Sequence, residues 1–596
     1  MQDIKTTGRK LQSYLIYFSE MIPELLLKLF LSWLAVSVCT IFRSDVKFTE
    51  KAFYEGKSLR ELILWILLCW ICLLPVKKQK WIAVATIVAA VLYSLLAVHA
   101  HTDFLFSAGC CAAVAIIIFC SKYIEFPADI PKSAKIIICS LLGIGFTVFV
   151  SGICCLYYQN YWTSCYDFGI FSQMFYYMKT TGLPLTTCER DELLNHFAVH
   201  FSPAYYFILP IYALLPDPRT LLVMQPLIVA SGIIPLVLLC KKHKLSNLSA
   251  TAFSLIYILY TGFSGGCFGY LHENCFLAPL LLWLIWSFEQ KKIILQFLFA
   301  LSVLAIKEDA AVYVAVVALY YLFDAKMWKT TLPVLVTTVV WFVVVTHRID
   351  TGGDGLMTGR YNNLIYKDDG GLLTVIAATI QNPVFVIQQC FSEEKIIFML
   401  ELLLPLGFLP LLTNRPARWI LLIPFVLVNL MTGYAFQYNS DFQYCFGSGV
   451  LLIYMAILNY SDLQKKRNVK KLLLTASCFS MIIWFGLYSH RADYPESYRS
   501  QTARREAIRA AIALIPENAV VASCCYFQPN LSQRDFVYQL ETTNQTAEYY
   551  IVDLRVQTEQ YSLEQFQTDQ YEQLYLEDGV VGLFRNTRYH ETATEG

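Results

Sequence analysis

Long apolar runs separated by short basic clusters make up most of the chain. The windows LLLKLFLSWLAVSVCTIF (25–42) and WIAVATIVAAVLYSLLAV (81–98) hold almost no charged residues. A helix needs roughly 20 apolar residues to cross about 30 Å of hydrocarbon. The pattern therefore predicts an all-α polytopic membrane protein with about 13–15 transmembrane helices.

Composition agrees with this prediction. Of the 596 residues, 57% are hydrophobic and 15% are charged, whereas soluble proteins average about 45–50% and about 25%. The net charge is only +1, so the placement of charges says more about partners than their sum does. Membrane lipid is the expected surrounding, and no nucleic-acid partner is expected.

The basic clusters predict which connections face the cytoplasm. They include KKQK (77–80), KKHK (241–244) and QKKRNVKK (464–471), and the N-terminal segment is basic as well. Cytoplasmic loops are enriched in Lys and Arg, so we place the N-terminus and these clusters inside. The connections predicted to face outward include loops 159–218, 264–274 and 348–394.

This alternation requires that the apolar segment 204–215 does not cross the membrane. The segment is short and is bounded by Pro203 and Pro216. Because a dozen residues or so cannot span the hydrocarbon layer, we expect a re-entrant or interfacial helix here.

Three parts follow from the change in composition along the chain. Residues 1–134 hold the first transmembrane helices, and residues 135–488 form a transmembrane core with the outer loops. From residue 489 the chain is polar, and REAIRAAIALIPENAVVASCCYF reads as a helix, a proline turn and a strand. With two further strands in EYYIVDLRV and GVVGLFRN, residues 489–596 predict a small extracytoplasmic α/β domain.

Nineteen cysteines occur mostly singly or as adjacent pairs; Cys69 and Cys72 form a CxxC only within an apolar run. Most lie in apolar runs, where cysteine behaves as a small hydrophobic residue. Two pairs share predicted outer loops, Cys165 with Cys188 and Cys267 with Cys275. Disulfides are possible there because the outer side is oxidising.

Asp167 stands at the start of a predicted amphipathic helix. Phe171, Met174, Phe175 and Met178 recur at helical spacing on its face. We expect this helix to lie on the outer surface, with its apolar stripe in the lipid headgroups. Asp167 is then either an N-cap or a general base or metal ligand at the membrane boundary.

His196 and His200 are four residues apart, so a helix would place both on one side. This spacing suits a metal, but the HExxH pattern is absent because no Glu follows His196. Ordinary loop histidines and a pair of imidazole donors for a phosphate are the alternatives.

Ionisable residues border the apolar runs at two further outer positions. His272 and Glu273 begin one run, and Lys307, Glu308 and Asp309 separate two others. Charges this close to hydrocarbon are costly, so they line a cavity or pair with each other. A local ion pair of Lys307 with Glu308 or Asp309 is one reading. With Asp167, all of them fall on one predicted face, which favours a common site.

Two late outer loops add further candidates. The glycine-rich loop 348–370 carries Arg360 and is either a mobile lid that brings Arg360 to a phosphate or a connector. The segment QYNSDFQYCFG (437–447) supplies Tyr438, Gln443 and Tyr444. Tyrosines are also common as simple anchors at membrane interfaces.

Several ordered motifs resemble one family of bacterial membrane proteins, that of domain of unknown function 2079. The motifs are YDFGIFSQ, NHFAVHFSPAYYFILPIYALLPDPRTLLVMQ, LHEN, KEDAAV and IPENAVVAS. The likeness runs from about residue 140 to 590. The family is distantly similar to the GT-C membrane glycosyltransferases, which take a sugar from a polyprenyl phosphate. Gln443 stands where relatives often have a histidine before the tyrosine, which weakens a ligand role there.

The resemblance implies roles for individual residues. Asp167 follows the predicted span 135–158, where GT-C enzymes carry an acidic residue, so it is the implied catalytic base. The implied partners of the donor phosphate are Lys307, Arg360, His196 and His200. A divalent metal such as Mg or Mn between Asp167 and Glu273 would help neutralise the phosphate. The site-lining candidates are His272, Glu273, Glu308, Asp309, Tyr438, Gln443 and Tyr444.

The expected function is that of a membrane glycosyltransferase in the bacterial cell membrane. It would move a sugar from a polyprenyl-phosphate donor to an extracytoplasmic acceptor. Two alternatives remain open at this point. One is a transporter or flippase of a polar or lipid-linked molecule, and the other is a non-catalytic membrane scaffold.

Overall fold

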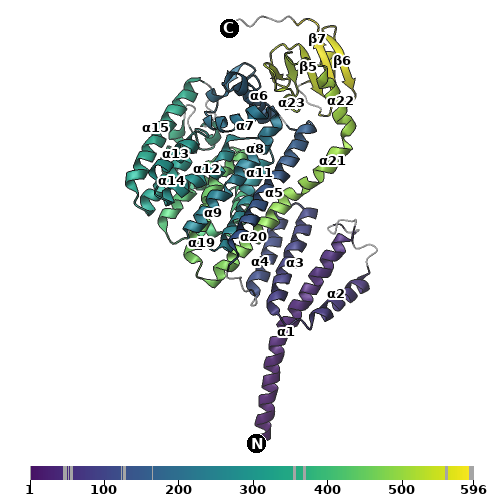
Figure 1. Ribbon diagram of the computed structural model, residues 1–596, viewed down its shortest axis with the longest axis vertical. Helices are drawn as coiled ribbons and strands as arrows, with labels where there is room; N and C mark the ends of the chain where they lie inside the picture. Colours follow the sequence, from purple (N-terminus) through teal and green to yellow (C-terminus); the bar gives the residue numbers. More distant parts are fainter. Residues whose placement is uncertain are drawn as a thin grey trace.

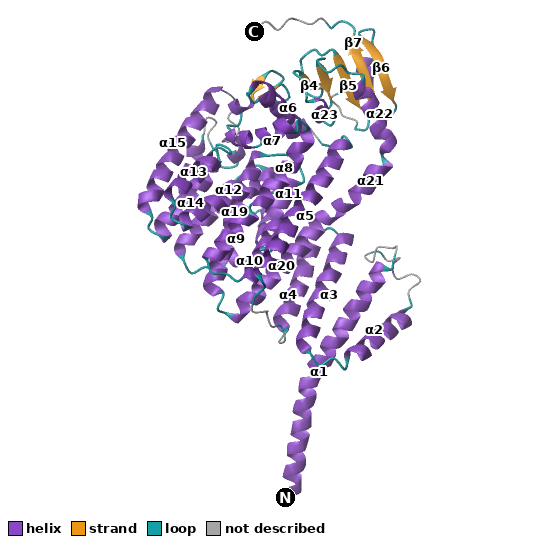
Figure 2. Cartoon of the chain, in the orientation of Figure 1, coloured by secondary structure: helices purple, strands orange, loops and turns teal. Residues whose placement is uncertain are grey.

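The fold is a large bundle of helices with a small sheet at one end (Figure 1). The computed structural model describes residues 2–44, 50, 53, 58–121, 124, 129–163, 165–352, 358–366, 371–556 and 561–589. Figure 2 shows that strands are confined almost entirely to the C-terminal part. The prediction of an all-α membrane part followed by a small α/β domain is confirmed.

The N-terminal part consists of four helices. They are α1 (Gln2–Phe42), α2 (Leu59–Leu73), α3 (Gln79–Ala100) and α4 (Phe104–Cys120). Both α3 and α4 pack against α20 (Arg467–Tyr488), with which they share an apolar cluster distinct from the main core. The late helix α20 thus attaches the N-terminal helices to the rest of the bundle.

The core bundle is built from helices of very different lengths. In chain order they are α5 (Lys132–Gln159), α8 (Pro218–Ser231), α9 (Ile233–Lys242), α10 (Asn247–Ile258), α11 (Thr261–Cys267), α12 (Leu277–Glu289), α13 (Ile293–Leu304), α14 (Ala310–Asp324), α15 (Trp328–Gly352), α16 (Leu372–Gln381), α17 (Pro383–Gln389), α18 (Glu393–Leu403) and α19 (Phe446–Leu463).

Seven helices in the described residues are long and apolar enough to cross a membrane, or eight if the bent pair α10–α11 counts as one span. Four shorter apolar helical segments of 10–17 residues accompany them. The 13–15 crossings expected from the sequence stay a prediction, because several of the apolar runs form short or broken helices rather than complete spans.

Helices α8 and α9 together form one long apolar segment, Pro218–Lys242, and their junction shows how a glycine permits close helix packing. The Tyr257 hydroxyl donates a hydrogen bond to the carbonyl of Val229 at 2.8 Å. A Cβ atom at Gly232 would lie 2.0 Å from that hydroxyl oxygen, far inside van der Waals contact. Glycine is therefore required where α10 approaches this junction.

The loop predicted to be the first outer one, residues 159–218, forms a compact cap over the core. It contains α6 (Cys165–Thr181), the short strands β1 (Leu185–Thr186) and β2 (Leu194–Asn195), the 3-10 turns His196–Ala198 and Pro203–Phe207, and α7 (Leu209–Leu214). With only six residues, α7 is too short to cross a membrane. Segment 204–215 therefore does not span, as the sequence predicted.

The apolar stripe of α6 faces protein and not lipid. Phe171, Met174, Phe175 and Met178 are all at most 4% exposed, and the ring of Phe175 packs on those of Tyr205 and Tyr212. The expectation that this stripe enters the headgroup layer is wrong. The aromatic residues of segment 203–214 cover it instead.

The C-terminal domain is a mixed five-stranded sheet with flanking helices. Its elements are α21 (Tyr494–Ser500), α22 (Thr502–Ala513), β3 (Val521–Ser523), α23 (Gln528–Leu531), β4 (Val537–Gln539), β5 (Tyr549–Asp553), β6 (Tyr571–Glu577) and β7 (Val581–Asn586). The strand order is β4-β3-β5-β7-β6. Strand β3 runs parallel to β4 and β5, and β7 runs antiparallel to β5 and β6. The predicted helix and three strands are present, whereas β4 and β6 were not foreseen.

This domain is hydrogen-bonded to the cap. Thr187 donates to the Val537 carbonyl at 2.8 Å and accepts from the Val537 amide at 3.1 Å. Arg555 donates to the carbonyl of Tyr161 at 2.6 Å. The exposed edge of β4 is thereby paired, and the sheet is fixed beside α6 (Figure 1).

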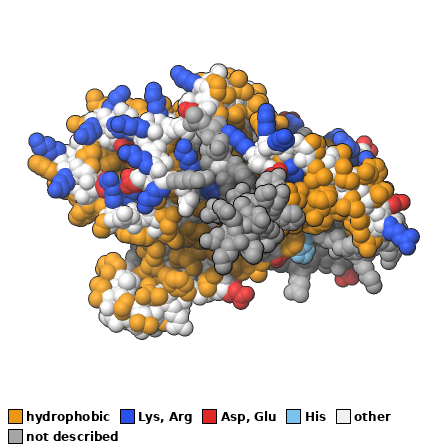
Figure 3. All heavy atoms as spheres, turned by 90° about the horizontal axis from the view of Figure 1, so that it is seen from below, with side chains coloured by type: hydrophobic (Ala, Val, Ile, Leu, Met, Phe, Trp, Pro, Cys, Tyr) orange, Lys and Arg blue, Asp and Glu red, His pale blue; other side chains and the backbone are white. Residues whose placement is uncertain are grey.

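The opposite end of the bundle is basic. Seen from that end, Lys and Arg side chains gather over much of the surface (Figure 3). Exposed lysines of segments 241–244, 290–292 and 464–466 contribute, and the His243 side chain reaches Glu289 at 3.2 Å while its carbonyl accepts from Ser461. The basic loops that the sequence placed on one side therefore do share one end.

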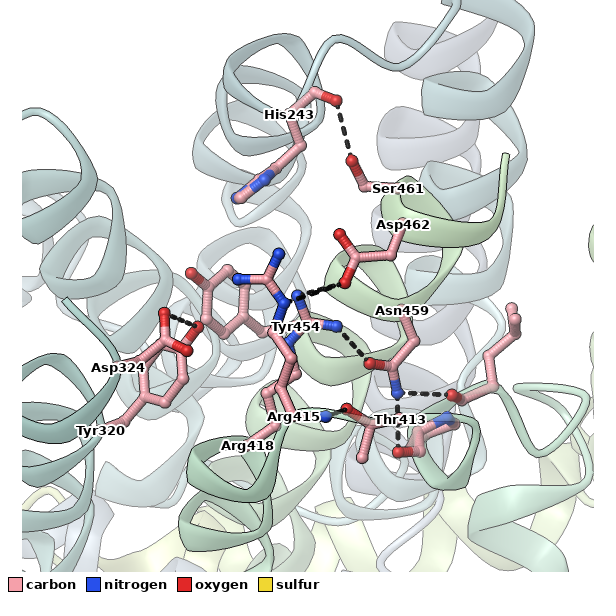
Figure 4. Close-up of polar contacts among 12 residues, drawn as sticks. His243, Tyr320, Asp324, Thr413, Arg415, Arg418, Tyr454, Asn459, Ser461 and Asp462 are labelled. Atoms are coloured by element: carbon pink, nitrogen blue, oxygen red, sulfur yellow. Dashed lines mark hydrogen bonds and ion pairs between the residues drawn. The ribbon is translucent and has the colours of Figure 1, made fainter. Parts of the chain in front are cut away.

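A polar network ties the helix breaks at this end together (Figure 4). Arg418 donates to Asn459 at 2.6 Å and pairs with Asp462 at 2.8 Å. The Asn459 amide in turn donates to the carbonyls of Leu409 and Pro410. These carbonyls lie where the chain leaves helical geometry, so the network satisfies backbone groups that would otherwise be buried unpaired.

Candidate functional site

A chain of alternating charges lies at the end of the bundle that carries the sheet. His272 Nε2 is 3.4 Å from Asp167 Oδ2, and His272 Nδ1 is 3.8 Å from Glu273 Oε2. Lys307 Nζ donates to Glu273 Oε1 at 2.7 Å. Asp167 comes from the first turn of α6, His272 and Glu273 precede α12, and Lys307 follows α13. Residues predicted from three separate segments therefore form one network.

Burial differs sharply along this network. The side chain of Glu273 is 2% exposed, that of Lys307 5% and that of His272 9%, whereas that of Asp167 is 39% exposed. Buried charges persist when each has an opposite partner. Asp167 is thus the point at which a buried, charge-balanced network reaches an accessible surface.

Three neutral side chains complete the network, and little in the sequence pointed to them. Tyr205 donates to Glu273 Oε2 at 2.6 Å, and Gln225 Oε1 accepts from the His272 amide at 2.7 Å. Tyr270 hydrogen-bonds to the Asp167 carboxylate. Tyr205 and Gln225 lie in apolar runs where they resemble anchors or core residues. Tyr270 stands two residues before His272 in GYLHEN, the one local signal available.

The network sets the protonation of its members. Burial alone lowers the pKa of His272, but its hydrogen bonds to Asp167 and Glu273 and their charges outweigh this and raise it to about 9. For Asp167, burial raises the pKa, but the hydrogen bond and positive charge of His272 bring it below its usual value. At neutral pH the pair is therefore a carboxylate beside an imidazolium.

The two histidines of the cap have separate partners. His196 Nδ1 lies 2.8 Å from Glu189 Oε2, and His200 Nδ1 lies 2.9 Å from Glu308 Oε1. Residues 196–198 form a 3-10 turn, and the two rings are 6.2 Å apart. The helical pairing considered for them is not formed. His200 joins the charged network through Glu308, whereas His196 points to Glu189.

The carboxylates proposed to share a metal have the ring of His272 between them, at the distances given above. Both carboxylate oxygens of Glu273 also accept hydrogen bonds, one from Lys307 and one from Tyr205. Within the described ranges, no group of three or more His, Cys, Asp and Glu side chains is arranged to hold a metal ion. In this structure an imidazole links Asp167 to Glu273, and a shared metal stays a prediction from the sequence.

Arg360 contributes a second cation to this end of the bundle. Its guanidinium lies 5.0 Å from the ring centroid of Tyr444 and 5.8 Å from that of Tyr434. The charges of Glu308 and Asp309 act on it and help to raise its pKa. Among the described residues, however, it forms no salt bridge. Lys307 is ion-paired with Glu273, so Arg360 is the cation here that lacks a carboxylate partner among the described residues.

Two buried carboxylate oxygens beside these cations also lack partners. Glu308 Oε2 and Asp309 Oδ1 accept no hydrogen bond within the described part of the chain. Burial and the neighbouring charge of Glu308 raise the pKa of Asp309 to about 6, although Lys307 opposes this. Unpaired buried polar atoms are costly, which indicates a site prepared for a polar ligand.

Two predicted residues form no hydrogen bond with this network in the described part of the chain, although the turn Gln443–Cys445 packs against the turn Glu273–Phe276. The ring of Tyr438 packs under the ammonium of Lys395, with 4.8 Å between Nζ and the ring centroid. Gln443 is 7% exposed and lies against Gly266. Of the late-loop candidates, Tyr444 alone is brought to the charged network, through Arg360.

The disulfide considered possible between Cys267 and Cys275 is not formed. Both thiols are free and buried, and Cys267 also receives a contact from the Cys154 thiol on its carbonyl oxygen. Cys188 is free as well, and its sulfur lies 3.3 Å from Gln173 Oε1. Its predicted partner side chain, Cys165, lies outside the described residues.

Comparison with known proteins gives one family and a loose structural likeness. The family described as predicted membrane protein (DUF2079) matches residues 158–590. ArnT from Cupriavidus metallidurans bound to undecaprenyl phosphate aligns with a TM-score of 0.49 at 10% identity, over 77% of this chain and 99% of ArnT. Apo ArnT from the same organism gives a TM-score of 0.41 at 11% identity, over 74% and 98%. No curated protein matches the sequence.

Proposed function

We propose a catalytic function for this chain, which belongs to the DUF2079 family of predicted membrane proteins. It transfers a sugar from a polyprenyl-phosphate donor to a hydroxyl group of an acceptor on the outer side of the membrane. The observation that carries this proposal is Asp167, an accessible carboxylate held ionised by a buried network. Arg360, at the same end of the bundle, has no carboxylate partner among the described residues.

Asp167 is the general base of the proposed reaction. The acceptor hydroxyl gives its proton to the Asp167 carboxylate while its oxygen attacks the anomeric carbon of the donor sugar. The bond between that carbon and the phosphate oxygen breaks, and the phosphate leaves with the electron pair. The imidazolium of His272 supports this role because it keeps Asp167 deprotonated and oriented.

Arg360 is the proposed partner of the leaving phosphate. Guanidinium groups bind phosphate through paired, charge-assisted hydrogen bonds, and this one has no salt bridge to give up among the described residues. Lys307 has a different role in this proposal. By pairing with Glu273 it allows the second carboxylate next to His272 to remain charged in a buried place.

The proposed orientation follows from the two ends of the bundle. The basic face shown in Figure 3 suits the cytoplasmic side, which would place the charged network and the sheet outside. A polyprenyl-phosphate donor fits this position because its tail stays in lipid and its phosphate lies at the boundary.

Native mass spectrometry of the protein in nanodiscs tests the donor part of this proposal. We expect the wild type to retain added undecaprenyl phosphate, and Arg360→Gln to lose about tenfold or more of that retention. Arg219→Gln is the matched control, because Arg219 is exposed and, within the described residues, its ion pair is with Asp217. Equal retention by all three proteins, or no retention beyond bulk phospholipid, would contradict the proposal.

A further inference from the structure

A polar cavity lies between the cap and the C-terminal sheet, beside the hydrogen bonds that join them. It has a volume of about 330 Å³, which is at the small end of known ligand pockets, about 300–1,000 Å³. Its lining residues are Thr187, Cys188, Glu189, Arg190, Asp191, Gln539 and Thr542. Five of them belong to the cap and two to the sheet domain, so the cavity exists only because the two parts are joined.

The rim of the cavity is rigidly held. Asp191 adopts a left-handed backbone conformation with φ of 62°, which is uncommon for a residue other than glycine. Its carboxylate accepts from the Thr543 hydroxyl and from the Asn544 amide, and its carbonyl accepts from Gln545. Three successive residues of the sheet domain thus fix one residue of the cap.

Other polar groups in the lining can bind a ligand. The Gln539 side-chain nitrogen is buried and lies next to the Glu541 carboxylate, without a hydrogen bond of ordinary geometry among the described residues. Arg190 is exposed and forms no salt bridge within them. The Thr542 side chain is exposed at the mouth. The cavity therefore offers amide, guanidinium and hydroxyl donors together with the carboxylate of Glu189.

This lining discriminates between classes of ligand. A lipid tail or apolar side chain is disfavoured, since Cys188 is the least polar of the lining residues. A peptide cannot extend the sheet here, because Thr187 already pairs with the edge strand β4. Glu189 and Asp191 place two carboxylates beside the single guanidinium of Arg190, and this net negative charge disfavours a polyphosphate. A ligand rich in hydroxyl groups matches both the donors and the acceptors of the lining, because a hydroxyl both donates and accepts hydrogen bonds.

The cavity is connected to the charged network by short contacts. Glu189 lines the cavity and binds His196 at 2.8 Å. The ring of His196 lies 6.4 Å from that of Tyr205, whose hydroxyl donates to Glu273. A ligand held against Glu189 is thus connected to the charged network through His196 and Tyr205.

We propose that this cavity is the acceptor subsite, and that the acceptor it binds is a carbohydrate. The inference rests on the proposed function, since it assigns the second substrate of the same reaction. The sheet domain then selects the acceptor through Gln539 and Thr542, while the cap supplies Arg190 and Glu189.

Binding of soluble oligosaccharides to the full chain in nanodiscs tests this assignment. The probe is a set of neutral and amino-sugar oligosaccharides of two to four units, measured by saturation-transfer NMR. We expect the wild type to bind at least one member. Thr542→Trp fills the mouth of the cavity, and Gln539→Leu removes a lining donor; each should weaken that binding about tenfold or more. Gln573→Leu, on the exposed face of β6, should bind like the wild type.

Retention of undecaprenyl phosphate is measured on the same samples and separates the two proposals. Normal donor retention by Thr542→Trp with lost oligosaccharide binding supports the acceptor subsite. Normal donor retention with no oligosaccharide bound by the wild type, or with equal binding by Thr542→Trp, overturns the subsite and leaves the donor proposal standing. Lost donor retention in the wild type counts against the proposed function itself.

Discussion

Replacing Glu273 by Gln tests whether the buried network is organised by charge. Gln has nearly the same shape and can still accept the hydrogen bond of Tyr205, but it leaves the ammonium of Lys307 without a counter-charge. The two side chains are 2% and 5% exposed and lie 2.7 Å apart. Water therefore cannot replace the lost partner.

The magnitude follows from this burial. Removing one partner of a buried ion pair costs about 3–5 kcal/mol, because the other charge stays buried and unpaired. An exposed pair is worth about 0–1 kcal/mol. The pair between Asp217 and Arg219, with side chains 41% and 46% exposed, is the matched control. We expect Glu273→Gln to lower the free energy of unfolding by about 3–5 kcal/mol, and Asp217→Asn by at most about 1 kcal/mol.

The assay is equilibrium unfolding in mixed micelles with increasing SDS, followed by tryptophan fluorescence. Lys307→Met should cost as much as Glu273→Gln, and the double variant should lose clearly less than the sum of the two. If Glu273→Gln is no worse than Asp217→Asn, or if the two single effects add, the network is not held by this ion pair and the reasoning fails.

Three further predictions concern other parts of the chain. Because the pKa of His272 is raised to about 9 from 6.5, its contribution to stability is full below about pH 6.5 and is lost as the pH rises through 9; the SDS unfolding midpoint should fall across that window in the wild type and stay level in His272→Gln. Gly232→Ala should destabilise by about 1–3 kcal/mol, because its Cβ would meet the Tyr257 hydroxyl at 2.0 Å, whereas Gly145→Ala meets nothing within 4 Å and should leave the unfolding midpoint unchanged or slightly raised. Thr187→Val removes two hydrogen bonds to the edge strand of the sheet and should speed limited proteolysis between the cap and the C-terminal domain; cleavage at the wild-type rate would contradict this.

Much of the architecture was predictable because it depends on local pattern. Apolar runs, basic clusters and the polar C-terminal part are each visible in a short window. The direction in which an apolar face of a helix points cannot be read from such a short window. The stripe of Phe171 and Phe175 has the same sequence whether it meets lipid or, as here, the aromatic rings of segment 203–214, since lipid tails are as apolar as a protein core.

The site was foreseen in membership but not in pairing. Lys307 was expected beside Glu308 or Asp309, whereas it pairs with Glu273, 34 residues earlier. Such a choice depends on how α12 and α13 pack, which no short window reveals. Strand β4 was missed for a related reason, because three residues stabilised by pairing with β3 carry too short a pattern to recognise.

Sugar transfer by the Asp167→Asn variant tests the central claim most directly. Purified wild type, Asp167→Asn and the control Asp217→Asn are incubated with an isotope-labelled undecaprenyl-phosphate sugar and cell-envelope acceptor, and labelled product is counted. We predict that Asp167→Asn retains undecaprenyl phosphate and a normal unfolding midpoint but loses transfer by about 100-fold or more, since general base catalysis contributes about 10²–10⁴-fold, while Asp217→Asn transfers normally. Transfer by Asp167→Asn at the wild-type rate, or no transfer by the wild type with any donor sugar supplied, would contradict the account.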